Sequence, residues 1–405
     1  MATDHTEVRL GLRANRKQFA LLVLVNAFVG GMVGLERTIL PEIAEGEFGV
    51  AARTAILSFI VVFGLTKAVT NYYMGRFAQR IGRRKLLILG WIFGLPVPLI
   101  LMFAPSWAWI VGANVLLGVN QGLCWSSTVI MKIDLVGERH RGLAMGLNEA
   151  AGYIAVGVVA FLTGWIAAEF GPRPHPFYLG IGLVVLGLVT SVVFIRDTAT
   201  HVDVEVGTSS LPKLDRVFWQ TTWGHPNLGS ISFAGMVNNL NDGMVWGLLP
   251  ILLIERTFTL EDVGLIAAIY PLVWGVGQLG TGRVADLVPR KQMLFIGMLM
   301  QGVVLCCFAF AGSKGIYIML AALLGVGTAA VYPTFLAAIA DNVHPGQRAE
   351  SIGIFRLWRD LGYAVGAVLT GVLADVLNIE FAMIAIGALT LLASAVIAVR
   401  MRPAL

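Results

Sequence analysis

Charged residues are scarce in this sequence: they make up 13% of the 405 residues, whereas 57% of the residues are hydrophobic. Soluble domains carry about 25% charged residues, so this chain has too little polar surface to cover a globule in water. The net charge of +5 is not gathered on a polar, soluble domain, which argues against a nucleic-acid-binding protein. The composition instead indicates a protein whose main solvent is lipid.

Cysteine is also scarce, and the three cysteines, Cys124, Cys306 and Cys307, all fall within apolar runs. Two of them are adjacent, so the sequence offers neither a disulfide framework nor the spacing of a metal site. The histidines form no His-Glu-x-x-His or Ser/His/Asp grouping, and the phosphate-binding pattern Gly-x-x-x-x-Gly-Lys-Ser/Thr is missing. We therefore expect no metal, no cofactor and no enzymatic activity, and we expect a proton or other ion gradient as the energy source.

Apolar residues occur in twelve long runs. A transmembrane helix needs about 20 mainly apolar residues, and the strands of a membrane barrel need only about ten alternating ones. We predict an all-α integral membrane protein with twelve transmembrane helices. The predicted spans are 18–41, 55–73, 86–105, 109–130, 142–167 and 177–195 in the first half, and 228–254, 263–281, 293–311, 316–339, 351–374 and 381–399 in the second.

The polar segments between the runs alternate in charge. Lys and Arg gather in 75–85, 131–142 and 283–291, whereas 42–47 and 255–262 are acidic. Basic segments stay on the cytoplasmic side of a membrane. We therefore predict a multi-pass protein of the cytoplasmic (inner) membrane with both termini in the cytoplasm.

The sequence repeats itself at a shift of 207 residues. Residues that recur include the pairs Gly75 and Gly282, Asp134 and Asp341, Arg141 and Arg348, and Gly146 and Gly353. Six spans separate equivalent points, so the halves are parallel repeats about an axis along the membrane normal, as in transporters that rock two bundles around a central site. We predict an N-terminal six-helix bundle at 1–195, a cytoplasmic linker at 196–227 and a C-terminal six-helix bundle at 228–405. Within the linker, 211–223 is either a short helix in the membrane interface or a plain connection.

Related motifs occupy the same place in the two halves. Segment 75–85 reads G-R-F-A-Q-R-I-G-R-R-K, and segment 282–291 reads G-R-V-A-D-L-V-P-R-K. Both resemble the loop pattern G-x-L-A-D-R-x-G-R-R/K of the major facilitator superfamily, and the resemblance extends over about residues 20–400. It implies the major facilitator fold and a secondary transporter that moves a small solute by alternating access.

In that family the two loops hold the cytoplasmic side shut in the outward-facing state, a contact that we call the latch. Its glycine allows close approach, its carboxylate lies at the positive N-terminal end of a helix in the opposite bundle, and its basic residues face the anionic membrane surface. The motif residues are Gly75, Gln79, Arg80, Gly82, Arg83 and Arg84, then Gly282, Asp286, Arg290 and Lys291. Because Gln79 replaces the carboxylate that Asp286 keeps, we expect a weak first latch and a strong second one. The alternative is that these charges only set the topology.

The first span resembles that of some drug–proton antiporters, because 34–41 reads G-L-E-R-T-I-L-P with Glu36 at the usual acidic position. This resemblance implies proton-coupled efflux. The fourth span has Gly118 where such antiporters carry an Arg, and the fifth span lacks their Gly-Pro pair. Uptake by proton symport, or uniport, is therefore the alternative. A membrane enzyme or a transporter-derived sensor is the alternative of another class.

Ionisable residues inside a span are costly and usually have a function. The candidates for proton coupling or substrate binding are Glu36, Lys67, Glu149, Asp242, Arg356, Arg359 and Asp360. They fall in spans that line the cavity or the seam between bundles in the family that the chain resembles. Two have structural alternatives, since Glu36 with Arg37 could reach the membrane interface and Lys67 could pair with an acid.

Asp242 is the best candidate for a proton carrier. It lies in mid-span beside Asn238, Asn239 and Asn241, and burial favours its neutral, protonated form.

Two further groups occupy equivalent positions in the two halves. Glu149 with Asn148, and the set Arg356, Arg359 and Asp360, lie in early turns of spans five and eleven. They form either a pair that breaks as the bundles move or a substrate site. Trp125 and Tyr332 are also equivalent and either stack on a substrate or pack between helices. The expected partners are the lipid bilayer, a small-molecule substrate and protons, with no nucleic acid, and we expect a monomer.

Overall fold

The computed structural model describes residues 8–37, 39–50 and 58–402, and the regular structure of these residues is helical throughout. Each predicted span falls on a long helix, except that the third falls on two helices in series and the first, 18–41, ends in a second, short helix. The first half contains α1 (Arg16–Arg37), α4 (Ser58–Ile81), α5 (Arg83–Gly94), α6 (Pro96–Phe103), α7 (Trp107–Val136), α8 (Arg141–Phe170) and α9 (Tyr178–Val193). The second half contains α12 (Pro226–Glu255), α13 (Leu260–Val284), α14 (Arg290–Phe308), α15 (Lys314–Asn342), α16 (Arg348–Val376) and α17 (Ile379–Arg400).

Shorter helices join these elements. They are α2 (Leu40–Gly46), η1 (Glu138–His140), η2 (His175–Phe177), α10 (Ala199–Thr208), α11 (Val217–Trp219), the π-helical η3 (Gln220–Gly224) and η4 (Pro345–Gln347). The helical turns of α11 and η3 fall within the segment where an interfacial helix was one of two expectations, whereas α10 was not predicted. Thr38 and residues 55–57, at the edges of predicted elements, lie outside the described residues.

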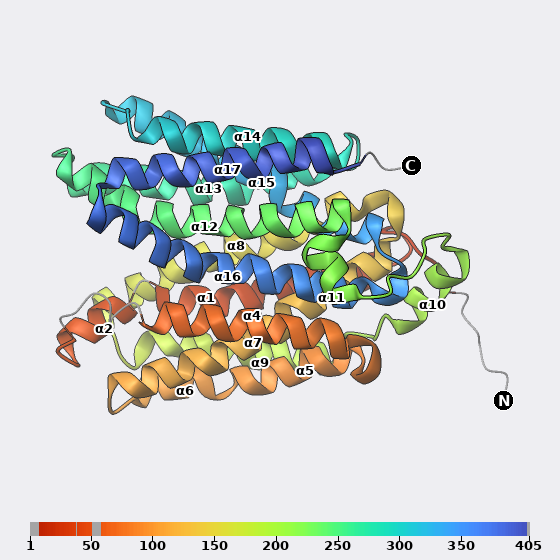
Figure 1. Cartoon of the computed structure of the whole chain (residues 1–405). Helices are drawn as coiled ribbons and strands as arrows, with labels where there is room; N and C mark the ends of the chain where they lie inside the picture. Colours follow the sequence, from red (N-terminus) through yellow and green to blue (C-terminus); the bar gives the residue numbers. More distant parts are fainter. Residues whose placement is uncertain (1–7, 38, 51–57, 403–405) are drawn as a thin grey trace.

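The long helices gather into two bundles that lie side by side, one from each half of the chain (Figure 1). Across the seam, α4 packs on α16 and α8 packs on α13. The described part of the chain begins and ends at the end of the bundles where α10 is found (Figure 1). We call this the linker end, and it contains the motif segments 75–85 and 282–291.

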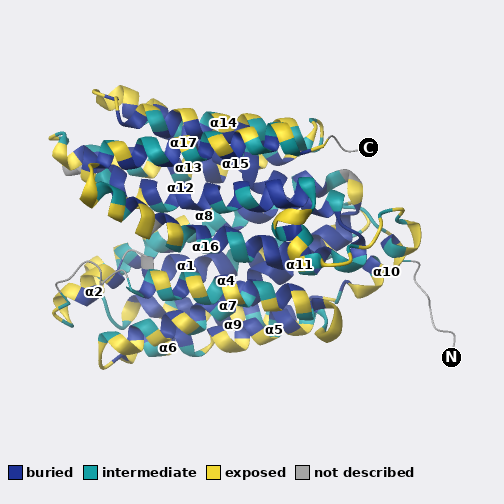
Figure 2. Cartoon of the chain, viewed as in Figure 1, coloured by how far each residue is buried: buried dark blue, intermediate teal, exposed yellow. Residues whose placement is uncertain are grey.

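Many large apolar side chains are exposed, among them Phe161, Phe310 and Val399. Figure 2 shows exposed residues along the outward sides of the outer helices, with buried residues between the helices. An apolar surface of this extent is unfavourable in water and suits lipid. Eight helices are long and apolar enough to cross a membrane by length and composition alone.

The helices α4, α7, α12 and α16 do not meet that criterion over the described part of the chain. The reason is visible in their sequences, because they carry polar residues such as Asn71, Gln121, Asn239 and Arg356 inside the span. These four side chains are fully buried. The polar residues therefore face the interior of the protein rather than lipid, as the cost of placing them in hydrocarbon requires.

Glycine pairs set the closest approach of the two bundles. A Cβ atom at Gly75 would lie 2.4 Å from the carbonyl oxygen of Ala349 and 2.8 Å from the Cα of Gly353. The equivalent pair is Gly146 and Gly282, where a Cβ at Gly146 would lie 2.9 Å from the other Cα. These are the glycines that recur at the 207-residue shift, so the repeat corresponds to two equivalent contacts across the seam, both at the linker end.

The predicted boundaries were wrong at this end of several spans. Most of segment 75–85 belongs to α4 and α5, with Gly82 as the only non-helical residue between them, at φ 93°. Lys132, predicted to lie in a loop, is inside α7 and fully buried. The helices extend beyond the apolar runs because buried polar side chains continue them toward the linker end.

Candidate functional site

Asp286 lies at the N-terminal end of α8, in the opposite bundle. Its Oδ1 accepts a hydrogen bond from the backbone N–H of Gly142 at 2.7 Å, and its Oδ2 accepts one from Leu143 at 2.9 Å. Arg290 also contacts the carboxylate, with Nη2 at 3.2 Å from Oδ1. The carboxylate thus meets both free backbone donors and the positive end of the helix dipole. This is the geometry expected of the second latch.

Gln79, the equivalent residue of the first half, is exposed. Within the described part of the chain it makes no hydrogen bond to the first turn of α16. The two latches are therefore unequal in geometry, in the direction that the loss of a carboxylate predicts. Arg80 is exposed and Lys291 is partly exposed, so neither belongs to the buried contact.

Two equivalent sets of ion pairs cross the seam beside the latches. Asp341 accepts from Arg290 Nε at 2.9 Å in its own half and from Arg141 Nη1 at 2.7 Å in the other half. The counterpart of Asp341 is Asp134, whose Oδ2 lies 3.2 Å from Arg83 Nε and whose Oδ1 lies 3.7 Å from Arg348 Nη1. All three positions of one set recur in the other at the 207-residue shift.

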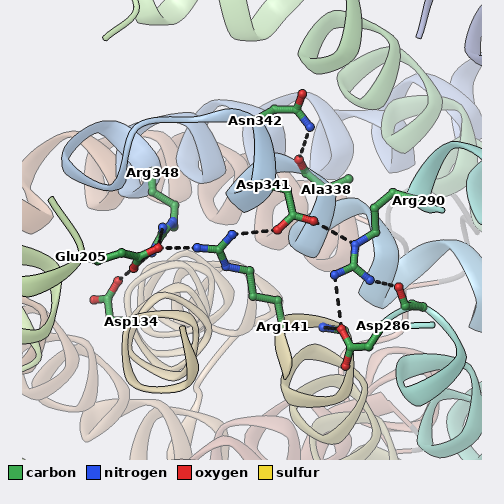
Figure 3. A network of polar contacts seen from close by, with 11 residues as sticks. Asp134, Arg141, Glu205, Asp286, Arg290, Ala338, Asp341, Asn342 and Arg348 are labelled. Carbon is green, nitrogen blue, oxygen red and sulfur yellow. Dashed lines mark hydrogen bonds and ion pairs between the residues drawn. The ribbon is translucent and has the colours of Figure 1, made fainter. Parts of the chain in front are cut away.

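Glu205, from the linker helix α10, lies between the two sets (Figure 3). Its carboxylate contacts Arg348 at 2.9 and 2.5 Å and also accepts a hydrogen bond from Arg141 Nη2. Burial opposes the charged form, but the hydrogen bond and charge of Arg348, with the charge of Arg141, outweigh it and lower the pKa of Glu205. One carboxylate of the linker thus pairs with an arginine of each bundle.

The remaining motif arginine, Arg84, anchors the start of α5. Its backbone N–H donates to Asp197 Oδ2 at 2.9 Å. Asp197 lies two residues before the linker helix α10, so the first motif also contacts the linker.

A second polar group lies in mid-bundle and joins the halves through neutral and charged side chains. Asn71 donates to Asp360 at 2.6 Å and accepts from Ser126 at 2.6 Å, and Arg356 donates to Ser126 at 3.0 Å. Arg359 contacts the neighbouring Asp360 at 2.8 and 2.7 Å. The residues come from α4, α7 and α16, so this group also spans the seam.

Glu149 joins the same group from α8. It is fully buried, and its Oε1 lies 3.5 Å from Arg356 Nη2 while it accepts hydrogen bonds from Trp125 at 3.1 Å and Asn148 at 2.7 Å. Lys132 in turn donates to Asn148 Oδ1. The expected pair between the fifth and eleventh spans is therefore present in the structure, but its role in transport stays a prediction.

Lys67 faces this group from the middle of α4 and is partly exposed. Its Nζ lies 5.3 Å from the ring centre of Trp125 and 5.6 Å from that of Phe63. No direct ion pair joins Lys67 to a carboxylate among the described residues, but the charges of Lys67 and Asp360 act on each other, so the alternative of a structural pair with an acid stays open.

Asp242 is fully buried in α12 and is held by tyrosines. It accepts hydrogen bonds from Tyr270 of α13 and, at 3.3 Å, from Tyr363 of α16. A carboxyl group that is surrounded by neutral donors can gain or lose a proton without breaking an ion pair, as a proton carrier must.

The three asparagines near Asp242 point in different directions. Asn239 accepts from Tyr332 at 3.0 Å. Asn238 is buried, and neither polar atom of its side chain has a partner among the described residues. Asn241 instead contacts Gln301 and Thr390 at 3.3 and 2.7 Å. Since Gln301 and Thr390 belong to α14 and α17, Asn241 is a contact within the second bundle rather than part of the central group.

Glu36 is 1% exposed. The interpretation that it reaches the membrane interface is therefore wrong, while the side chain of Arg37 lies outside the described residues.

Aromatic rings lie next to the charged group. Tyr153 lies 5.4 Å from Trp125, 4.2 Å from Trp274 and 6.0 Å from Tyr332, measured between ring centres. Trp274 and Tyr332 are 4.9 Å apart. The cluster joins α7 and α8 to α13 and α15, so Trp125 and Tyr332 are placed together as equivalents across the seam.

Sequence reasoning missed several members of these groups. Tyr153 and Tyr363 recur within Gly-Tyr pairs, and that repeat was a usable signal. Tyr270 and Trp274 have no such counterpart. Glu205 lies in a polar segment without a counterpart in the other half, so nothing in the sequence connects it with Arg141 and Arg348.

A family model described as Major Facilitator Superfamily matches residues 20–229 and 231–404. The chain belongs to the major facilitator superfamily. Its members are transporters, so the protein is a multi-pass membrane transporter and not an enzyme.

Relatives agree with this assignment. The proton-coupled antiporter flippase LtaA of Staphylococcus haemolyticus is 22% identical over 91% of this chain and 89% of its own length. Multidrug resistance protein 2 of Bacillus subtilis is 22% identical over 90% and 91%. The fosmidomycin resistance protein of Escherichia coli is 27% identical, but the match spans only 36% of either chain. The matches to three of the relatives thus span less than two thirds of those proteins' own lengths, namely 36%, 46% and 62%.

The crystal structure of the human organic anion transporter MFSD10 (TETRAN) has the same fold. It superimposes with a TM-score of 0.78, at 15% identity, over 95% of this chain and 99% of that one.

Proposed function

We propose that this transporter is a proton-coupled exporter of a small solute that works by alternating access. The observation that carries the proposal is Asp242, a fully buried carboxyl group held by Tyr270 and Tyr363 beside the seam. Relatives named as a proton-coupled antiporter flippase and a multidrug resistance protein support proton coupling and export.

The membrane placement follows from the basic segments. We propose that the linker end is cytoplasmic, because Lys and Arg gather there, and that the protein is a monomer of the cytoplasmic membrane. In this arrangement the glycine pairs, the Asp286 latch and the ion pairs close the cytoplasmic side. We infer an outward-facing state, and the contacts at the linker end break when the central site opens to the cytoplasm.

Uptake by proton symport is the second candidate. Antiport binds the proton and the solute in alternation, whereas symport binds them together. Both mechanisms use a buried carboxyl group, so Asp242 alone does not distinguish them. The distinction requires a measurement of solute flux with the proton gradient applied in each direction.

The test begins with a thermal-shift screen of solutes on the purified protein, followed by transport of each hit into proteoliposomes. Under the export proposal, flux of the hit rises when the proton gradient opposes it and disappears as a gradient-dependent component in Asp242→Asn. Flux that rises with the gradient in the same direction would establish symport instead. The matched control adds Asn241→Asp to the Asp242→Asn protein. This places a carboxyl group one position away, where the side chain faces α14 and α17, and it should not restore proton coupling. Full gradient-driven transport by Asp242→Asn would overturn the role of this residue.

A further inference from the structure

We infer that the central site binds an organic anion, with Lys67 as its main charge contact and the neighbouring aromatic rings as the contact for its apolar part. This inference rests on the proposed function only in taking the central site as the solute site, and its test measures binding alone. The argument depends on which charges in mid-bundle are already neutralised.

Charged groups reach the centre from five helices. They are Lys67 of α4, Lys132 of α7, Glu149 of α8, Asp242 of α12, and Arg356, Arg359 and Asp360 of α16. Within this group the four cations exceed the three carboxylates by one, and the buried Glu36 lies outside it, one residue from the far end of α1. The excess becomes two whenever Asp242 carries a proton. Unbalanced charge in the low-dielectric interior is costly, so an arriving anion is favoured and an arriving cation is disfavoured.

Most of these groups already have partners. Arg359 pairs with Asp360, Lys132 donates to Asn148, and Asp242 is held by tyrosines. The Nη2 and Nε atoms of Arg356 have no hydrogen-bond partner among the described residues, although Nη2 is 3.5 Å from Glu149. Lys67 makes no ion pair within the part of the chain described: its ammonium group lies over aromatic rings, and the charge of Asp360 acts on it without a direct contact.

The exposure of Lys67 adds a second, independent point. It lies in the middle of a membrane-spanning helix, where its neighbours Asn71 and Ala68 are fully buried, and yet it remains partly exposed. Its position over the ring of Trp125 places it toward the inter-bundle centre rather than toward lipid. The side chain of Lys67 therefore keeps some exposed surface on the side of the centre.

The rings beside Lys67 suit a flat, apolar ligand part. Trp125 contacts Lys67 and Tyr153, and Tyr153 contacts Trp274 and Tyr332. A carboxylate, phosphonate or sulfonate at Lys67 thus leaves the rest of the ligand against aromatic faces. Charge-assisted hydrogen bonds to such an oxyanion are about twice as strong as neutral ones, so Lys67 contributes both affinity and selection by charge.

The probes for this test differ in charge but share one ring system. Indole-3-acetate, indole-3-acetamide and tryptamine are such a set, and further aromatic acids are tested beside their amides and amines. Binding to the purified, detergent-solubilised protein is measured by thermal shift and by a direct titration. We expect the best-binding acids of the panel to bind at least tenfold more tightly than their amides and amines.

Variants of Lys67 separate binding from structure. Lys67→Met should weaken the best acid at least tenfold, while the ligand-free protein stays as thermostable as the parent because no ion pair is lost. Lys67→Arg should restore most of the binding, and Lys17→Gln, an exposed lysine at the start of α1, should change nothing. Equal or tighter binding of the amines, no binding by any acid, or a Lys67→Met protein that keeps acid binding within twofold would each overturn the inference. If only the proposed proton coupling were wrong, solute flux would not depend on the proton gradient, whereas the protein would still bind the acids more tightly than their amides and amines.

Discussion

Single residues decide how firmly the linker end is held. Asp286 meets two backbone N–H groups of α8, whereas Gln79 is exposed at the equivalent place. A carboxylate at a helix N-terminus contributes about 0.3–1 kcal/mol, and up to about 2 kcal/mol when partly buried. The difference between the two halves is therefore a difference of one charge, and it is accessible to substitution.

At this scale we predict opposite effects of Asp286→Asn and Gln79→Asp. The first removes the charged contact and should raise the population that is open at the linker end several-fold. The second adds a carboxylate near the start of α16 and should lower it. The reporter is Ala144→Cys, a fully buried position in the first turns of α8, in a protein whose three native cysteines have been replaced. Thiol labelling of the reporter should become faster in Asp286→Asn and slower in Gln79→Asp. The same labelling rate in both variants would contradict a latch at either position.

Pairs of helices decide how closely the bundles meet. The crossing of α4 with α16 and the crossing of α13 with α8 depend on glycines, because any side chain at Gly75 would collide with the backbone of Ala349 and Gly353. Small residues serve the same purpose at helix contacts in membranes generally. A backbone atom cannot move aside as a flexible side chain can, so the cost falls on the separation of the two helices.

At the scale of the element, Gly75→Ala should keep the linker end open and reduce transport strongly. Gly64→Ala is the matched control, since Gly64 lies in the same helix and an added Cβ there would meet nothing within 4 Å. Spin labels placed on α4 and α16 at the linker end should show a longer mean distance for Gly75→Ala and the parental distance for Gly64→Ala. An unchanged distance in both variants would show that the glycine contact does not limit closure.

At the scale of the whole molecule, Glu205 of the linker contacts both bundles. Glu205 contacts Arg141 of the first bundle and Arg348 of the second, so the closed linker end requires three parts of the chain at once. Removing this carboxylate leaves two buried arginines without their shared anion, which is unfavourable by several kcal/mol in other buried ion pairs. The linker is therefore part of the closed state and not only a connection.

At this scale the prediction concerns pH. Because the pKa of Glu205 is lowered in the closed state, its contribution to closure is fully present above the ordinary pKa of Glu and is lost as the pH falls through the lowered value. As far as this group is concerned, we expect the linker end of the parent protein to stay closed from pH 8 down to the ordinary pKa of Glu, about 4.3, and to open only at a pH below it. Glu205→Gln should open it across the whole range, measured by labelling of Ala144→Cys. The assignment would be contradicted if the parent protein opened between pH 7 and 6 and the Glu205→Gln protein did not.

Much of the architecture was predictable from sequence, because membrane solvation imposes a strong pattern on every span. Long apolar runs marked the helices, and the repeat of Gly75 as Gly282 marked the two halves. The resemblance to a family loop pattern, and not the sequence alone, implied that the carboxylate of Asp286 would lie at the end of a helix in the opposite bundle. These features are encoded locally, or in a spacing that a single sequence contains.

Other features depend on contacts between residues far apart in the chain, and only the tertiary structure decided them. Burial separated Asn239, which faces the centre, from Asn241, which faces α14 and α17. The fold places Glu205 between two arginines that lie 64 and 143 residues away in the sequence. It also places Lys67 beside aromatic rings, without a direct contact to an acid among the described residues. Composition and period determine that a helix crosses the membrane and which residues are polar. The rotation of each helix and the packing across the seam determine which of those polar groups meet.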